Sequence, residues 1–444
     1  MKPRSITAPV LLVVIGVIFL INNIWHDVPV WALVADYWPE MLIVLGLIGL
    51  VEALYHASRG EPNPPRPLAG GGIVWIVMLI AFFSWAGNHG NLHIGPFSNG
   101  FGMLGTEYTY EVNATGASQG VSRVVLDNLK GNLSLKGEAG GDVKVSGRKS
   151  VRAFGKADAD KANDQSPVHV ERQGDLLIIR ADDPKNSHSS SISVDLDITI
   201  PKGIDVEARG RTGDLTIDDI AGNVAVTSGR GDVRLTNIGK DVKIESSRGG
   251  LIRATDVKGK VDLQGRGGDV QLENIAGEVT VNGEFSGTLE FQALAKPLHF
   301  QSQRSDFHVE GVPGTITLDL GDLKMNNVTG PVRFQTSTRD IEATDISNGL
   351  EISVEHGDIQ VTETKMPLPK MDIHSHNGDV TLAMPEKAGF DLDGKTGQGE
   401  VSNDFGDPLK TEQSGRAATI KGKQGSGPDI KVGTDRGTLT VKKS

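Results

Sequence analysis

Gly213-Asp214-Leu215 and Gly231-Asp232-Val233 are two copies of the short unit that decides the fold of this chain. The unit joins a glycine, an acidic or small polar residue and an apolar residue, and eleven full or degenerate copies follow one another. Their central residues run from 214 to 400, a mean period of (400 − 214)/10 = 18.6 residues. Such self-similarity indicates a solenoid, in which each repeat forms one coil. The central positions are 214, 232, 250, 269, 288, 306, 322, 340, 358, 379 and 400.

Apolar side chains recur within each unit at positions +1, +3, +6, +10 and +12 from the central residue. The second copy shows them as Val233, Leu235, Ile238, Val242 and Ile244. Steps of two indicate β-strands, and the longer steps fall where Asn, Asp and Gly cluster, as they do in tight corners. The sequence therefore predicts coils of short strands, stacked about 4.8 Å apart around one apolar core.

The same spacing places several aromatic side chains in inward positions of the coils. We expect them to fill the interior, which leaves no obvious internal cavity for a ligand. These aromatic residues include Phe291, Phe300, Phe307 and Phe334.

The composition limits the chemistry that this chain can perform. Its 444 residues are ample for more than one domain, and the 56 glycines belong to turns, because no collagen period is present. The absence of cysteine excludes disulfides, thiolate metal sites and cysteine nucleophiles. A net charge of −11 argues against a nucleic-acid partner, because phosphate binding needs a basic surface.

Three apolar runs occupy residues 1–87 and predict a transmembrane region with spans at about 8–24, 41–57 and 70–87. Positively charged residues precede the first run and lie in the loop between the second and third runs, whereas residues 22–40 contain no Lys or Arg. The positive-inside rule then puts the N-terminus in the cytoplasm and residues 88–444 outside it. The charges used here are Lys2, Arg4, Arg59 and Arg66.

The rest of the chain divides into three segments. Residues 88–106 are rich in glycine and predict a linker. Residues 107–205 predict irregular first coils and a cap, with one short helix at 153–163, because the end of a solenoid has to cover its open edge. Residues 206–444 predict the regular β-solenoid repeats and C-terminal strands.

The solenoid part resembles a known bacterial family. The run Val194-Asp195-Leu196-Asp197-Ile198-Thr199-Ile200-Pro201-Lys202-Gly203, followed by the Gly-Asp units and by Gly437-Thr438-Leu439-Thr440-Val441, is similar to the "putative adhesin" domain family. The resemblance covers about residues 107–444. It implies an extracytoplasmic β-solenoid domain of unknown function, and no catalytic residues come with it.

The membrane part resembles a different family. Residues 9–20, followed by Tyr37-Trp38-Pro39-Glu40-Met41 and the apolar residues to Gly46, are similar to the LiaF-like transmembrane region. The resemblance covers about residues 1–55 and does not include the third span. It implies a role in envelope-stress signalling, with a membrane sensor protein as partner.

Six arginines stand one to three places before the central residue of their unit, so stacked coils would bring them together beside the aspartates. They would form a ligand stripe for anionic glycans or lipid headgroups, or else an Arg/Asp ladder that relieves repulsion between like charges, which we favour on sequence grounds. The stripe consists of Arg211, Arg230, Arg248, Arg266, Arg304 and Arg339.

Other motifs are weaker. Residues 389–396 match the P-loop expression, but Pro385 precedes them, Gly397 and Gly399 follow, and two aspartates inside would repel phosphate. His356, His374 and His376 could share a strand face, although exposed histidines are commoner than metal sites. Acid pairs such as Asp218-Asp219 could serve polysaccharide cleavage, but they recur as corner residues. We assign no catalytic, cofactor or metal residue.

Together these observations predict a mainly β protein: a single-stranded, parallel β-helix-like solenoid preceded by three transmembrane α-helices, in the bacterial cytoplasmic membrane. The expected function is that of a non-enzymatic adhesin-like or scaffold protein, with the membrane and envelope glycans as partners. A LiaF-like regulatory component and a polysaccharide-active enzyme are the alternatives. The sequence does not determine the ligand, the handedness of the coil or the oligomeric state.

Overall fold

The computed structural model describes residues 106–128, 130–153, 155–181 and 191–444. They belong to one compact unit, Phe101–Ser444. The three predicted spans and nearly all of the predicted linker lie outside the described residues. Within the described part, no helix is long and apolar enough to cross a membrane. The short helix expected at 153–163 is present as α6 (Lys156–Asp164).

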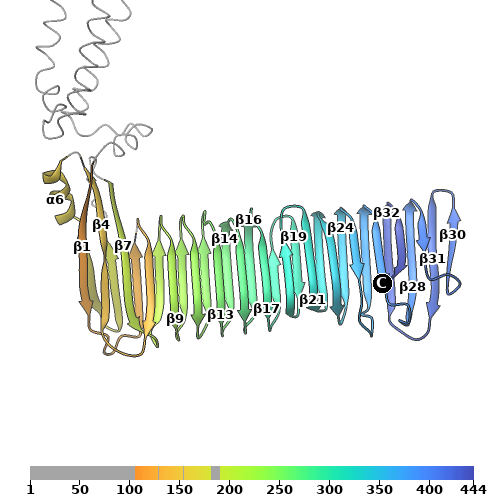
Figure 1. The fold of residues 1–444 in the computed structure, drawn as a ribbon, viewed down its shortest axis with the longest axis horizontal. Coiled ribbons are helices and arrows are strands. Elements are labelled where there is room, and N and C mark those ends of the chain that lie inside the picture. The colour runs from red at the N-terminus through yellow and green to blue at the C-terminus, as the bar shows by residue number, and fades with distance from the viewer. Residues whose placement is uncertain (1–105, 129, 154, 182–190) are drawn as a thin grey trace, which may run out of the picture. The chain divides into compact units, whose positions relative to one another are not determined.

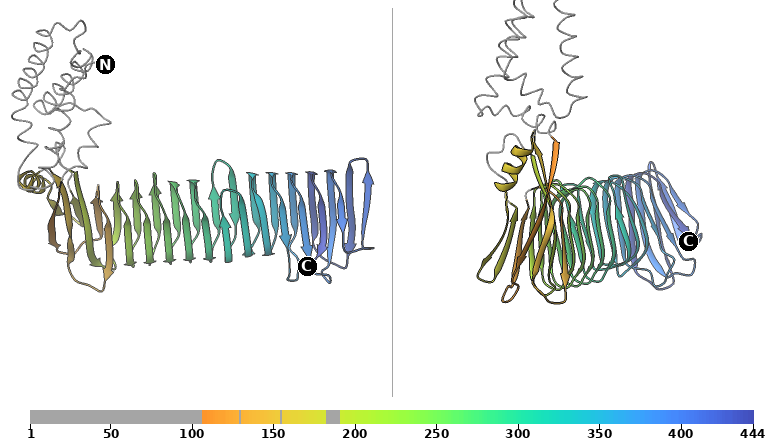
Figure 2. Two further views of the ribbon diagram at one scale, coloured as in Figure 1. Left: turned by 45° about the horizontal axis from the view of Figure 1, so that its top comes forward. Right: turned by 60° about the vertical axis from the view of Figure 1, so that its left-hand side comes forward.

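The repeats build two sheets, which we call sheet A and sheet B. In sheet A, β9 (Leu215–Ile220) pairs in parallel with β11 (Val233–Ile238), and in sheet B, β10 (Val224–Ser228) pairs in parallel with β12 (Val242–Ser246). Each regular coil therefore contributes one strand to each sheet. Figures 1 and 2 show the resulting stack of strands, which confirms a mainly β solenoid.

Sheet A has 16 strands, and their spatial order departs from chain order near both ends. The order is β1 (Thr106–Gly116), β4 (Val143–Ala153), β7 (Ser191–Pro201), β3 (Leu133–Glu138), β9, β11, β13 (Ile252–Val257), β15 (Val270–Ile275), β17 (Leu289–Leu294), β20 (Val312–Leu318), β21 (Asp322–Thr329), β23 (Asp340–Ser347), β25 (Ile359–Thr362), β27 (Val380–Met384), β33 (Leu439–Lys443) and β29 (Val401–Asn403).

Sheet B runs alongside it, and its pairings give a matching order. The order is β5 (Val168–Gln173), β6 (Leu176–Ala181), β2 (Arg123–Asn128), β8 (Asp205–Gly210), β10, β12, β14 (Val261–Gly267), β16 (Val279–Phe285), β18 (Leu298–Gln301), β19 (Ser305–Val309), β22 (Val332–Thr338), β24 (Leu350–His356), β26 (Met371–Asn377), β32 (Asp429–Arg436), β28 (Phe390–Gln398), β31 (Ala417–Gln424) and β30 (Leu409–Ser414).

The core lies between the two sheets, and the predicted apolar positions fill it. Leu235 and Leu272 are at most 1% exposed, as the repeat pattern required. The four phenylalanines expected to point inward, Phe291, Phe300, Phe307 and Phe334, are all buried. The rings of Phe307 and Phe334 pack edge to face, with their centres 5.4 Å apart. The interior is therefore packed with side chains along the regular coils.

The chain passes from sheet B to sheet A at one edge of the stack, which we call the Gly-Asp edge after its repeated motif. Gly231 has φ +127°, and a Cβ atom there would lie 2.1 Å from the carbonyl oxygen of Gly213 in the preceding coil. Gly378 stands in the same relation to Gly357. Glycine is required at these corners both by the backbone conformation and by the close stacking of the coils.

The opposite edge, where the chain passes from sheet A to sheet B, uses Asn and Asp instead of glycine. Asp219 and Asn237 both adopt positive φ, near +60°, which short polar side chains tolerate. The Asn237 amide nitrogen donates to the Asp219 carboxylate at 2.7 Å, so the two corners are also joined through their side chains. This confirms the predicted corner position of the Asn and Asp clusters.

One coil runs in the reverse direction, which corrects the prediction of a uniformly parallel stack. β19 pairs antiparallel with both β18 and β22, and β20 pairs antiparallel with both β17 and β21. Turns at 302–304 and 319–321 reverse the chain within one sheet instead of crossing to the other. The unit centred on Asp306 keeps its inward apolar residues, because alternation along a strand does not depend on the strand's direction.

Both ends of the solenoid are interleaved. The coil formed by β2 and β3 lies between the coil of β6 and β7 and the coil of β8 and β9. Likewise β32 lies between β26 and β28, and β33 lies between β27 and β29. The strand of the unit at residue 400, β29, is therefore the outermost strand at this end of sheet A, although the C-terminal strand β33 follows it in sequence. The predicted division at residues 205 and 206 stays a prediction.

The N-terminal end is covered by α6, which packs against β4 and β1 (Figure 1). The Lys149 side chain of β4 is buried, and its Nζ donates to the carbonyl oxygens of Asn163 at 3.0 Å and Ser166 at 2.5 Å. Burial lowers the pKa of Lys149. A lysine beneath the C-terminus of a helix satisfies carbonyl groups that the helix leaves free.

We expect Gly231→Ala to lower the melting temperature of the protein, because the new Cβ would press on the Gly213 carbonyl and the backbone would be strained by roughly 1–3 kcal/mol. Thermal unfolding followed by circular dichroism measures this. Gly203→Ala is the matched control, because Gly203 lies in an exposed turn with no atom within 4 Å of a new Cβ. Equal melting temperatures for the two variants would contradict the stacking role of the corner glycine.

Candidate functional site

The aspartates of the Gly-Asp motif form a column along the Gly-Asp edge, where they bind the backbone. Asp214 Oδ1 accepts the N–H of Asp232 at 2.9 Å, and Asp232 Oδ1 accepts the N–H of Leu251 at 2.9 Å. Asp358 Oδ1 accepts the N–H of Asp379 in the same way at 2.8 Å. Each carboxylate satisfies a donor that the corner would otherwise leave open. The repeated Asp is thus explained by the fold.

Inward hydroxyl groups complete this edge. Ser375 Oγ donates to the carbonyl oxygen of Gly357 at 3.0 Å, and Thr434 Oγ1 donates to that of Gly378 at 2.8 Å. Both side chains are buried at the end of a sheet B strand. Glycine, aspartate and hydroxyl residues of the repeat therefore bind one another's backbone from coil to coil.

The six predicted stripe arginines all lie at the Gly-Asp edge, but they do not all occupy equivalent positions within their coils. Arg230 and Arg248 each follow the register pair Ser228 and Ser246 by two residues, so they occupy equivalent places in adjacent coils. Arg211 and Arg266 stand one residue earlier in their coils, and Arg266 lies opposite Glu284. Arg304 belongs to the reversing turn at 302–304, and Arg339 follows β22.

The arginines and aspartates do not form the ladder that we favoured on sequence grounds. Arg234, on the outer face of sheet A, is the cation that reaches the column, with Asp232 at 2.5 Å and Asp214 at 3.7 Å. Among the described residues, no salt bridge joins a stripe arginine to a carboxylate. The guanidinium groups of the five exposed stripe arginines are therefore available to a partner: Arg211, Arg230, Arg248, Arg266 and Arg304.

Arg339 differs from the other five because it is half-buried. Its Nε donates to Ser305 Oγ at 3.4 Å, while its Nη1 is buried with no hydrogen-bond partner. Burial lowers the pKa of this guanidinium, and the Asp319 carboxylate opposes that shift. Arg339 occupies the place that glycine takes before Asp232 and Asp358, and it fills the corner beside the reversed coil.

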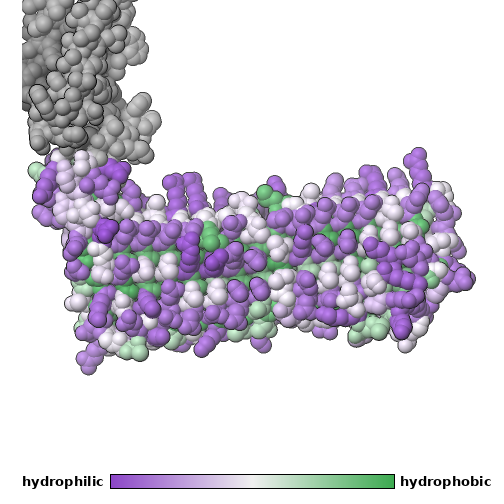
Figure 3. All heavy atoms as spheres, in the orientation of Figure 1, coloured by the Kyte–Doolittle hydropathy of each residue, from purple (hydrophilic) through white to green (hydrophobic). Residues whose placement is uncertain are grey.

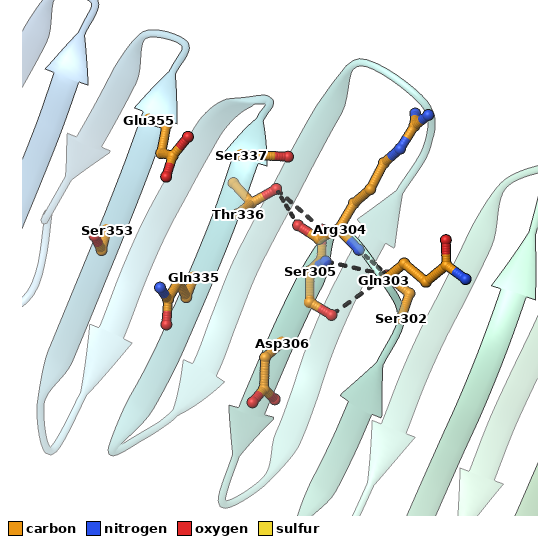
Figure 4. Close-up of a pocket in the computed structure, with 10 residues that line it drawn as sticks. All are labelled: Ser302, Gln303, Arg304, Ser305, Asp306, Gln335, Thr336, Ser337, Ser353 and Glu355. Atoms are coloured by element: carbon orange, nitrogen blue, oxygen red, sulfur yellow. Dashed lines mark hydrogen bonds between the residues drawn. The ribbon is translucent and has the colours of Figure 1, made fainter.

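A hollow of about 290 Å³ lies on sheet B beside the reversed coil, and we call it the reversed-coil hollow (Figure 4). It extends from the turn at 302–304 across β22 to β24. Its lining consists of Ser302, Gln303, Arg304, Ser305, Asp306, Gln335, Thr336, Ser337, Ser353 and Glu355.

A second hollow, of about 270 Å³, lies on the outer face of sheet A. The Arg253 Nε donates across it to Gln271 Oε1 at 2.7 Å, so part of its polar surface is already paired. The other lining residues are Thr255, Leu272, Glu273, Glu290 and Gln292. Hydrophilic side chains cover most of the face drawn in Figure 3, and apolar residues show as a band between them and as small patches at its borders.

The three histidines considered as metal ligands are separated by the strand register. His356 lies opposite Asn377, whereas His374 lies opposite Ser353, so His356 is displaced from the other two. His376 Nδ1 lies 2.6 Å from Asp435 Oδ2, and His374 Nε2 lies 3.7 Å from the other oxygen of that carboxylate. In the part of the chain that the structure describes, no three His, Cys, Asp or Glu side chains converge as metal ligands.

The P-loop match lies within a strand. Residues 389–396 include most of β28, which pairs with β31 and β32 and is not followed by a helix. No helix N-terminus is present there to hold a phosphate. The acid pair Asp218-Asp219 also has a structural role, because Asp219 accepts a hydrogen bond from the Asn237 side chain.

Glu363 is a buried carboxylate that the sequence pattern did not single out. It is 2% exposed, and its Oε1 accepts the N–H of Ile346 at 3.0 Å. Burial raises the pKa of Glu363 to about 7; the Ile346 N–H opposes the shift, Asp345 adds to it and Lys365 opposes it. Glu363 stands five residues after Asp358, at the corner position where other coils carry Asn or Asp.

The reversed-coil hollow was also missed, although Arg304 and Asp306 of its lining had been singled out, because periodicity does not reveal the direction of a strand. One signal was present in the sequence: the units centred on 306 and 340 lack the glycine that precedes the central residue in the clearest copies. Arg304, Ser305 and Arg339 mark this departure. A break in the repeat was therefore a better pointer to a surface feature than the repeat itself.

A family model matches most of this chain. Residues 132–442 match the model of a family described as Toastrack DUF4097. A search of curated proteins finds no significant match.

Several solved structures align with the chain at 10% identity. A "putative cell adhesion protein" from Clostridium sporogenes covers 76% of this chain and 100% of its own, with a TM-score of 0.20. A "putative lipid binding protein" from Parabacteroides distasonis covers 77% and 98%, with a TM-score of 0.21, and a "putative adhesin" from Bacteroides fragilis covers 76% and 97%, with a TM-score of 0.18. At these TM-scores the likeness supports no inference about ligand or role.

Glu363 gives the protein a pH-dependent stability whose sign follows from its pKa. Between the unfolded value of 4.5 and the folded value of about 7, the folded chain binds the extra proton. The free energy of unfolding therefore falls as pH rises through this window, by on the order of 3 kcal/mol in full. Glu363→Gln removes the dependence, and we expect this variant to melt above the wild type at pH 8.5.

The measurement is thermal unfolding at pH 5 and pH 8.5. At pH 5 the wild type and Glu363→Gln should melt within a few degrees of each other, because the carboxyl group is then protonated. Glu273→Gln, which changes an exposed carboxylate, is the control and should follow the wild type at both pH values. If the melting temperatures of the wild type and of Glu363→Gln change with pH in the same way, the pH dependence does not come from the raised pKa of Glu363.

Proposed function

The chain belongs to the Toastrack DUF4097 family, and we propose that it is a membrane-anchored protein of the bacterial envelope, whose β-solenoid presents a non-enzymatic, adhesin-like binding surface. The observation that carries this proposal is the row of exposed, unpaired arginines along the Gly-Asp edge. The core of the solenoid is packed with side chains, so the groups available to a partner lie on the outside. The stacked coils hold Arg230 and Arg248 at equivalent places, and Arg211 and Arg266 one residue earlier in their own coils.

The chemistry of the arginine edge favours anionic partners. A guanidinium group donates in a planar fork that fits carboxylate, sulfate and phosphate groups. Arg230 and Arg248, in adjacent coils, are separated by about one strand spacing, roughly 4.8 Å. Anionic envelope glycans or lipid headgroups are therefore the partners that we propose for this edge.

A non-enzymatic role is supported by the way the acidic residues are used. The column of Asp214, Asp232 and Asp358 accepts backbone hydrogen bonds, and Asp219 accepts one from the side-chain amide of Asn237. A glycosidase needs one carboxyl group that protonates the leaving group and a second that acts as base or nucleophile. Carboxylates that are fixed to the backbone as corner ligands are poor candidates for either task.

Anchoring and topology are proposed from the sequence. The spans at about 8–24, 41–57 and 70–87 would cross the cytoplasmic membrane. They would place the N-terminus in the cytoplasm and residues 88–444 on the extracytoplasmic side. The asymmetry of Lys and Arg in the loops supports this orientation. The proposed direct partners are thus the membrane itself and envelope glycans.

The second candidate function is regulation of envelope stress. Its support is the resemblance of residues 9–20 and 37–46 to the LiaF-like transmembrane region. In that case the spans would contact a membrane sensor protein, and the solenoid would act as its extracytoplasmic part. Co-purification of the full-length protein with a sensor kinase from native membranes would favour this function over adhesion.

The topology is testable because the chain contains no cysteine. We expect Ser247→Cys, at an exposed corner, to react with a membrane-impermeant maleimide in intact cells. Asn63→Cys, in the predicted cytoplasmic loop, should react only after the cells are lysed. Labelling is measured by a gel shift, and the cysteine-free wild type is the blank. Labelling of Asn63→Cys in intact cells, or protection of Ser247→Cys, would overturn the proposed orientation.

The arginine edge is tested by binding of the full-length, detergent-solubilised protein to acidic oligosaccharides and to vesicles containing anionic lipid. We expect Arg230→Gln/Arg248→Gln to weaken binding by about tenfold or more for each lost charge-assisted contact. Binding should also fall with added salt.

The control for this test is Arg253→Gln/Arg333→Gln, which removes the same charge from arginines that are already paired with Gln271 and Glu351. It should bind like the wild type. If both double variants lose affinity equally, the attraction is a general effect of charge and the edge is not the site.

A further inference from the structure

The reversed-coil hollow carries polar groups that the protein itself leaves unused. The side chains of Gln303, Gln335, Ser353 and Glu355 take part in no hydrogen bond or ion pair within the described residues (Figure 4). On β22 and β24, the neighbouring cross-strand residues Arg333 and Glu351 do form an ion pair, with Arg333 Nε 3.0 Å from the Glu351 carboxylate. The hollow is thus a place where donors and acceptors face solvent without partners.

A chain of hydrogen bonds makes the floor of the hollow rigid. Arg339 Nε donates to Ser305 Oγ at 3.4 Å, Ser305 Oγ lies 3.0 Å from Thr336 Oγ1, and Thr336 Oγ1 donates to the Arg304 carbonyl oxygen at 3.3 Å. Ser305 and Thr336 are both 3% exposed. The turn at 302–304 is therefore tied to β22, and the side chains above it are held in place before any ligand arrives.

The reversal of the coil explains why the hollow is here. In the regular coils the chain crosses from sheet B to sheet A at the Gly-Asp edge. After β18 it turns back within sheet B, and β19 then lies against β22 in the antiparallel sense. The turn and the outward residues of β19, β22 and β24 thus line one hollow, in which Gln303 and Arg304 point away from β22 (Figure 4).

The lining selects the class of ligand. Gln335 and Gln303 each offer a donor and an acceptor, the serines offer both from one atom, and Asp306 and Glu355 accept. This mixture suits a ligand that carries many hydroxyl groups, each of which donates and accepts. Asp306 and Glu355 are balanced by the guanidinium groups of Arg304 and of Arg339 in the floor, but Glu355 has no ion-pair partner among the described residues, so its carboxylate disfavours an acidic sugar beside it and tolerates an amino group.

We propose that the reversed-coil hollow binds one ring of a neutral or amino-bearing saccharide, and that the side chains of Gln335, Ser353 and Glu355 make the main hydrogen bonds to this ring. The proposal rests on the proposed envelope-binding function and adds a site that adjoins the arginine edge at Arg304 but binds through other residues. At about 290 Å³ the hollow is at the small end of ligand pockets, so it holds one sugar of a longer chain. The arginine edge would then contact acidic groups elsewhere on the glycan.

The test measures binding of the full-length, detergent-solubilised protein to an array of neutral, amino-bearing and acidic oligosaccharides. We expect Gln335→Leu to reduce binding of neutral and amino-bearing chains at least tenfold, and to leave binding of purely acidic chains unchanged. Gln360→Leu makes the same substitution at an exposed position of sheet A and should bind like the wild type. Equal melting temperatures show that the variants are folded.

Glu355→Gln separates the two ligand types. It should weaken binding of amino-bearing chains at least fivefold and leave neutral chains within twofold, because only a cationic amino group needs the carboxylate. The inference is overturned if Gln335→Leu binds neutral and amino-bearing chains as the wild type does, or if the wild type binds acidic chains alone. In the latter case the proposed function stands, and binding resides at Arg230 and Arg248. A wild type that binds none of the three classes defeats both proposals.

Discussion

The main-chain contact between successive coils at the Gly-Asp edge is the constraint on which the structure depends. Coils one strand spacing apart bring each corner against the carbonyl group of the corner before it, and Gly231 and Gly378 leave no Cβ in that gap. Asp214 and Asp358 then bind the N–H of the next corner, so the stack is closed by hydrogen bonds outside the sheets as well as within them. With both contacts in place, the apolar residues of each coil meet in one continuous core.

This use of the repeated residues changes where function should be sought. Glycine and aspartate are the most visible feature of the sequence, yet their backbone conformation and carboxylates are committed to stacking. Residues that are free to meet a partner stand outside the pattern, as Arg230 and Arg248 do at the edge and Gln335 and Glu355 do beside the reversed coil. In a repeat protein the departures from the consensus therefore carry more information about binding than the consensus does.

The irregular coils show how a long stack is ended and interrupted. A terminal coil at the very end would pair on one side only and would fray, whereas β2 with β3 and β32 with β33 have neighbours on both sides. The segments beyond them, with α6 at one end and the β30–β31 hairpin at the other, serve as caps. The reversed coil keeps the core continuous, because Phe307 and Ile316 still point inward, but it changes the outer surface locally.

The sequence by itself determined the period, the short strands of each coil, the inward residues such as Leu235 and Leu272, and the corners, because side-chain alternation and turn chemistry act over a few residues. It also indicated that the arginines would gather at one edge. Only the tertiary structure decided that β19 and β20 run backwards, that the terminal coils are interleaved, that Arg234 rather than the stripe pairs with Asp232, and that Glu363 is buried. These outcomes depend on which strands lie side by side, and alternating apolar residues fit either strand direction and any neighbouring coil.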